Sequence, residues 1–138
     1  MKMIWKVNCV SLLYAFSLFI QVELLVNVYR LERVTGITPM DRYVPVAVLI
    51  IFILSTILAY VLTRFKLNPG NLKYLTTIGW IPYLLIFIKC FAYAYPITDP
   101  QERPLPGIGL VIIAVSCMYP FYIAFLTFCA DLGVSEPR

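Results

Sequence analysis

Four long apolar segments set the strongest constraint on how this chain can fold. They run over about residues 7–28, 44–63, 74–95 and 108–130. About 20 apolar residues, at a rise of 1.5 Å each, cross a hydrocarbon core of about 30 Å as an α-helix. The segments are continuously apolar and about twice as long as a barrel strand, which argues against a transmembrane β-barrel. The sequence therefore predicts an all-α polytopic membrane protein, a four-transmembrane-helix bundle made of two hairpins.

The composition indicates a chain that lies almost wholly within the membrane. Of its 138 residues, 62% are hydrophobic and 13% are charged, whereas a soluble domain is about 45–50% apolar and about 25% charged. We therefore expect residues 1–138 to form a single transmembrane domain. The first apolar segment is longer than the apolar region of a signal peptide, so we expect it to be a retained span.

The lysines and arginines predict how the spans are oriented. Cytoplasmic loops of membrane proteins carry an excess of these residues, and the side that holds both termini would carry six of them against four. We therefore predict a multi-pass protein of the cell membrane with both termini in the cytoplasm. The basic residues are scattered at segment ends rather than gathered in a run, so we expect no nucleic-acid partner.

The sequence contains no histidine. This absence argues against haem held by axial histidines and against zinc sites that need imidazole. It also removes the commonest general base of enzymes. We therefore expect no cofactor, no metal site and no catalytic residue, and we interpret the protein as non-enzymatic.

Two charged residues, Glu23 and Lys89, lie well inside the apolar segments. Each is about 15 or 16 residues from the start of its segment, so at 1.5 Å per residue they lie at nearly the same depth. Because a charge inside the bilayer is costly, we expect the two to face each other as a structural ion pair. Two alternatives stay open. Lys89 can extend its stem to the interface, or Glu23 can bind a proton or a cationic substrate.

Helical spacing predicts which faces carry polar residues. Asn27 follows Glu23 by four positions and Tyr93 follows Lys89 by four, so each pair shares a helix face. On the third segment we expect one inward stripe through Gly79, Pro82, Ile86, Lys89 and Tyr93. The predicted polar seam of the bundle consists of Asn27, Ser55, Tyr93 and Ser116.

Two prolines, Pro82 and Pro120, lie inside the third and fourth segments and are predicted helix kinks. A proline removes one backbone hydrogen bond within a helix and clashes with the preceding turn. Such a kink is either a static bend or, as in transporters with discontinuous helices, part of a binding cavity.

Three stretches resemble a known family. They are "NPGNLKYLTTIGW" at residues 68–80, "LPGIGLVIIAVS" at residues 105–116 and, more loosely, "DRYVPVAVLI" at residues 41–50. The part from Lys66 to Cys129 is similar to small four-span bacterial membrane proteins of unknown function, often encoded beside a helix-turn-helix regulator. The resemblance implies four spans and assigns no site residue.

Two function hypotheses follow from these features. The first is a non-enzymatic accessory, regulatory or immunity-type module that acts in the lipid bilayer through helix contacts, with another membrane protein or with itself as an oligomer. The second is a small oligomeric proton-coupled transporter that uses Glu23, since four spans and a first-span glutamate resemble the small multidrug exporters. The group Asp99, Glu102 and Arg103 in the last loop is interpreted as a solvated turn.

Overall fold

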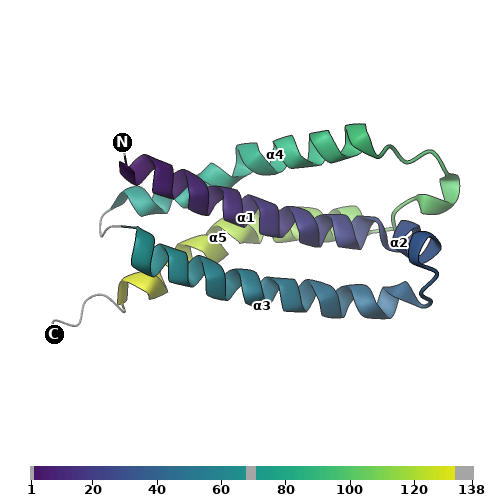
Figure 1. The fold of residues 1–138 in the computed structure, drawn as a ribbon, viewed down its shortest axis with the longest axis horizontal. Helices are drawn as coiled ribbons and strands as arrows, with labels where there is room; N and C mark the ends of the chain where they lie inside the picture. The colour runs from purple at the N-terminus through teal and green to yellow at the C-terminus, as the bar shows by residue number, and fades with distance from the viewer. Residues whose placement is uncertain (1, 68–70, 133–138) are drawn as a thin grey trace.

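Four long helices lie side by side in the computed structural model, which describes residues 2–67 and 71–132 (Figure 1). Each is long and apolar enough to cross a membrane, the third of them together with the short 3-10 helix η1 (Asn71–Leu75) that precedes it. The four-span prediction is therefore confirmed. The helices are α1 (Lys2–Val26), α3 (Met40–Lys66), α4 (Thr76–Ala94) and α5 (Ile108–Leu132).

Three of these helices extend beyond the predicted spans. α1 begins at Lys2 rather than at residue 7, and α3 continues to Lys66 rather than ending at residue 63. Polar and charged residues continue a helix as readily as apolar ones, because the backbone hydrogen bonds define its ends and the apolar pattern does not. Arg64 and Lys66 lie in the last turn of α3, where a positive charge suits the helix dipole.

The connection between the first two long helices is not a simple loop. It contains a further short helix, α2 (Val28–Thr35), which turns away from the direction of α1 at one end of the bundle (Figure 1). α2 ends at Gly36, whose φ of 69° is the left-handed conformation that glycine adopts without strain. Val28 packs against the start of α3, so the helix is attached to the bundle.

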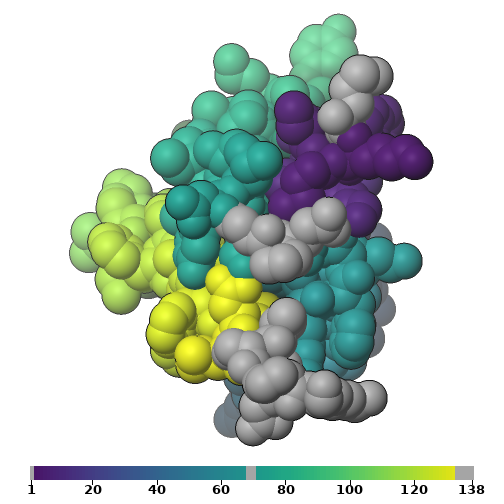
Figure 2. All heavy atoms as spheres, turned by 90° about the vertical axis from the view of Figure 1, so that its left-hand side faces the viewer, coloured from purple at the N-terminus to yellow at the C-terminus, as the bar shows by residue number. Residues whose placement is uncertain are grey.

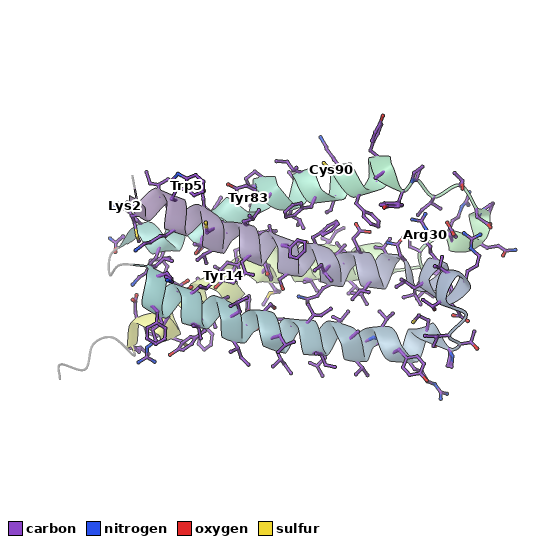
Figure 3. The ribbon with its side chains drawn as sticks, viewed as in Figure 1. Lys2, Trp5, Tyr14, Arg30, Tyr83 and Cys90 are labelled. Carbon is purple, nitrogen blue, oxygen red and sulfur yellow. The ribbon has the colours of Figure 1, made fainter. Side chains whose placement is uncertain are left out.

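The core is arranged around α1, which packs along α4 on one side and α3 on the other. An aromatic cluster joins all four long helices: Tyr14 of α1 meets the rings of Tyr119 and Tyr122 of α5 edge-on. Trp80 of α4 meets Tyr119 at 5.0 Å between centroids, and Phe52 of α3 lies 5.3 Å from Tyr122. Tyr14 lies between α1 and α3 in Figure 3. The Tyr119 hydroxyl donates a hydrogen bond of 2.9 Å to the backbone carbonyl of Tyr14.

The helices meet closely at the end that carries the chain termini. Figure 2, which faces this end, shows the start of α1 beside α4 and the end of α5 beside the end of α3. Here Lys73, which is buried, forms an ion pair with Asp131 of α5. Ser11 and Gly79 mark a close approach of α1 and α4, because a Cβ added to Gly79 would lie 2.6 Å from the Ser11 hydroxyl oxygen.

The opposite end of the bundle is looser. α4 diverges from α1 towards the end that carries α2 (Figure 1). The first half of α5, residues 108–118, has no fully buried residue, whereas its second half contributes Tyr119, Ile123 and Leu126 to the core. The divergence leaves a pocket between α1, α4 and α5.

Candidate functional site

The pocket at the α2 end has a volume of about 550 Å³. Its walls are almost entirely apolar, and the side chain of Glu23 is the one acidic group among the residues that line it. Pockets of about 300–1,000 Å³ with apolar walls and few polar groups are typical small-molecule sites. The lining residues come from α1 (Val22, Glu23, Val26), from Asn27, from α4 and the segment after it (Ile88, Phe91, Ala92, Tyr95, Pro96, Ile97) and from α5 (Ile112).

Glu23 is held in place by a neighbour on its own chain segment. The Asn27 amide donates a hydrogen bond of 2.8 Å to the Glu23 carboxylate and one of 2.9 Å to the Glu23 backbone carbonyl. Asn27 interrupts the helix between α1 and α2, a position that suits asparagine because its side chain competes for backbone hydrogen bonds. The sequence predicted that these two residues share a face, and the structure brings them together.

The structure does not pair Glu23 with Lys89. None of the ion pairs between described residues joins these two side chains, and Lys89 is exposed on the surface of α4. Its neighbour Cys90 is exposed as well (Figure 3). The ion pair expected from the sequence is therefore not formed, because Lys89 lies on an exposed face of α4 whereas Glu23 lines the pocket.

The face of α4 that packs inward is not the predicted stripe. Within that stripe Pro82 and Lys89 are exposed, Ile86 is 55% exposed and Tyr93 is 92% exposed. The inward face instead carries larger apolar residues, with Gly79 at its edge against Ser11. In a bilayer an apolar side chain is as stable against lipid as against protein, so spacing alone does not identify the buried face. The inward face consists of Trp80, Leu84, Phe87, Ile88 and Phe91.

The other members of the predicted polar seam lie apart from one another. Asn27 is buried beside Glu23, whereas Tyr93 is exposed. Ser55 is half-buried and donates its hydroxyl to the carbonyl of Phe52 in its own helix, and Ser116 is half-buried in α5. The described residues thus hold local polar contacts rather than one continuous seam.

The two predicted kinks lie inside continuous helices. Pro82 is within α4 and Pro120 is within α5, and each helix is unbroken on both sides of its proline. Neither proline lines the pocket. The pocket forms nearer the ends of α4 and α5 that face α2.

Aromatic rings form part of the pocket wall. Phe91 of α4 and Tyr95, which directly follows α4, have ring centroids 5.2 Å apart, and the ring centroid of Phe19 of α1 lies 5.8 Å from that of Phe91. Rings in such a wall attract a cation through the negative charge density of their faces. The site therefore combines a carboxyl group with aromatic surface in an otherwise apolar cavity.

A cluster of charged residues, here named the α2 clasp, lies at the α2 end of the pocket and consists of Arg30, Arg33 and Glu102. Glu102 belongs to the short 3-10 helix η2 (Pro100–Glu102), and its side chain is 5% exposed. Both arginines form ion pairs with it, Arg30 at 3.1 Å. Glu102 is therefore not part of a solvated turn, which corrects the prediction for this loop.

Arg30 also fixes the rim of the pocket. Its guanidinium donates hydrogen bonds of 3.2 and 3.3 Å to the backbone carbonyls of Tyr95 and Pro96, which directly follow α4. Carbonyls just beyond the end of a helix have no helical partner, so a side-chain donor can satisfy them. The signal for this contact in the sequence was weak: two arginines three residues apart in one loop and a glutamate in another.

Among residues 2–67 and 71–132, no group of three or more acidic or cysteine side chains is arranged to hold a metal ion. The fold and the pocket define an integral membrane protein of four spans with an acidic group in a largely apolar pocket. Comparison of the chain with protein-family models, with curated proteins and with solved structures finds no match. The family resemblance described above therefore stays a prediction.

Proposed function

We propose that this protein is a small non-enzymatic membrane protein that binds a hydrophobic cation in the Glu23 pocket in exchange for a proton. This is the binding step of a proton-coupled transporter. The observation that carries the proposal is the position of a carboxyl group inside an apolar cavity of about 550 Å³. A hydrophobic cation fits both features, since its apolar body matches the walls and its charge matches the carboxylate.

The surroundings of Glu23 support a cation rather than a neutral ligand. Lys89 is exposed elsewhere on α4, and Arg30 forms its ion pair with Glu102, so neither cation pairs with the carboxylate. Asn27 donates to one carboxylate oxygen and carries no charge of its own. Phe91 and Tyr95 add aromatic surface, which is worth about 0.5–2 kcal/mol for a cation near a ring.

Exchange with a proton follows from the chemistry of one carboxyl group. The ionised form binds the cation, and the protonated form does not attract it. Proton and cation therefore compete for Glu23, and the affinity for the cation falls as the pH falls through the pKa of the carboxyl group.

The experiment is binding of tetraphenylphosphonium to the purified protein in dodecylmaltoside, followed by isothermal titration calorimetry. Glu23→Gln is expected to weaken binding at least tenfold, or about 1.4 kcal/mol or more. The matched control is Glu32→Gln, which makes the same charge change on α2 outside the pocket and is expected to bind as the wild type does. Equal binding by Glu23→Gln and the wild type would refute the proposal.

A second candidate function is the accessory module that acts through helix contacts. The observation that favours it is the first half of α5, residues 108–118, which has no fully buried residue. Cys117 lies in this segment and is exposed. If a second copy packs there, copper-phenanthroline oxidation in membranes yields a disulfide-linked dimer that Cys117→Ser abolishes, whereas a monomer yields none.

A further inference from the structure

The α2 clasp connects the two hairpins of the bundle, α1 with α3 and α4 with α5, at the α2 end of the Glu23 pocket. Arg30 and Arg33 belong to the connection between α1 and α3, and Glu102 belongs to the connection between α4 and α5. The ion pair at the other end, Lys73 with Asp131, instead lies within the second hairpin. Release of the clasp would therefore separate the hairpins at the pocket end while the second hairpin stays joined.

The segment that the clasp holds is the rim of the pocket. Residues 95–97 line the cavity, and Arg30 binds the carbonyls of two of them. The segment has little apolar packing of its own, because Tyr95 is 61% exposed and Ile97 is 43% exposed. Polar contacts with Arg30 thus do more than hydrophobic burial to keep this rim in place.

We propose that the α2 clasp is a gate that controls access of water and ions to the Glu23 pocket. The inference rests on the proposed function, since it names the regulation of the same site. With the clasp formed, residues 95–97 cover the α2 end of the pocket, and a ligand reaches Glu23 only from the lipid side. With the clasp released, the rim moves away, and Glu23 exchanges its proton with water.

The clasp is built so that it can open. Arg33 is 59% exposed, so water competes for its ion pairs with Glu102 and, at 3.8 Å, with Asp99. An ion pair with one exposed partner opens more readily than a pair in which both partners are buried. Arg30, in contrast, is mostly buried, and it contacts both Glu102 and the rim of the pocket.

The test measures how fast a charged thiol reagent in water reaches the pocket. Val26→Cys places a thiol on the pocket wall, in a protein whose native Cys9, Cys90, Cys117 and Cys129 are replaced by serine and which is held in lipid nanodiscs. Adding Glu102→Gln is expected to raise the labelling rate at least tenfold. Glu32→Gln, the same charge change on α2, is expected to leave the rate unchanged.

Two further variants make the result decisive. Val34→Cys, at a position that is 74% exposed, reports general reactivity and is expected to react equally with and without Glu102→Gln. If Glu102→Gln fails to fold, Arg33→Gln replaces it, because this exposed side chain can be changed without leaving a buried cavity, and a severalfold rise is expected. An unchanged Val26→Cys rate in the folded clasp variant would overturn the gate.

The labelling experiment tests the gate and the cation-binding experiment tests the proposed function, so either proposal can be refuted without the other. Labelling needs no cation, so a faster rate in the clasp variant supports the gate even if tetraphenylphosphonium does not bind. Binding that depends on Glu23 together with an unchanged labelling rate would leave the proposed function intact and refute the gate alone.

Discussion

The close approach of α1 and α4 at Ser11 and Gly79 gives a sharp prediction about stability. A Cβ at position 79 would lie 2.6 Å from the Ser11 hydroxyl oxygen and 3.3 Å from the Ser11 Cβ, whereas ordinary contact begins at 3.4 Å. The Ser11 hydroxyl is buried between the two helices, so Gly79→Ala must either force this side chain out of its rotamer or push the helices apart. Overpacking of this kind is expected to lower the free energy of unfolding by about 1–2 kcal/mol.

Removal of the obstructing oxygen is expected to restore most of that loss. The Ser11 hydroxyl is buried without a hydrogen-bond partner among the described residues, so Ser11→Ala alone forfeits no bond and should change stability by less than about 0.5 kcal/mol. In the double variant the nearest atom is the Ser11 Cβ at 3.3 Å, which needs only a small shift. The two substitutions are therefore coupled, and their effects are not additive.

The assay is SDS-induced unfolding in mixed micelles, followed by circular dichroism. Gly109→Ala is the matched control, because a Cβ at Gly109 meets nothing within 4 Å, and alanine is favoured over glycine in a helix by about 0.5–1 kcal/mol. It is expected to be neutral or stabilising. The reasoning is refuted if Gly79→Ala is as harmless as Gly109→Ala, or if the double variant is no more stable than Gly79→Ala.

Three further predictions concern other contacts in the bundle. Tyr119→Phe removes a buried hydrogen bond to a carbonyl of α1 and should cost about 0.5–1.5 kcal/mol in the same assay; no loss would count against that bond. Asp131→Asn should destabilise the fold more than Lys73→Met, because it leaves the buried lysine unpaired while the carboxylate is 34% exposed and can be solvated; the reverse order would contradict this account. A double-mutant cycle of Glu23→Gln and Lys89→Met should show a coupling energy below about 0.5 kcal/mol, since no ion pair joins them; strong coupling would restore the pair expected from sequence.

The four spans could be predicted because the bilayer imposes one length and one polarity on every crossing helix. The rotation of each helix about its own axis, which decides the face that is buried, could not be predicted. On α4 the sequence favoured the stripe through Lys89 and Tyr93, but Trp80 and Leu84 face the core. Apolar and aromatic residues surround this helix, and lipid accepts them on any side, so the sequence holds no strong signal for the inward face.

Of the candidate site, the sequence predicted the contact within one helix but not the contacts between distant segments. The local pair Glu23 and Asn27 follows from helical spacing, and the structure confirms that they are in contact. The α2 clasp depends on how two connections fold over the end of the bundle, and Arg30 and Glu102 are 72 residues apart in the chain. Gly36, which ends α2 in a left-handed conformation, was the one local sign that the first loop contains a helix.

The central claim is that Glu23 exchanges a proton for a hydrophobic cation. It is tested most directly by proton release when tetraphenylphosphonium is added to the protein in a weakly buffered detergent solution. The wild type and Glu32→Gln are expected to release up to one proton per bound cation, with release increasing as the starting pH falls through the pKa of the Glu23 carboxyl group. Glu23→Gln is expected to release none. Cation binding without proton release at every pH, or equal release by Glu23→Gln, would contradict the account.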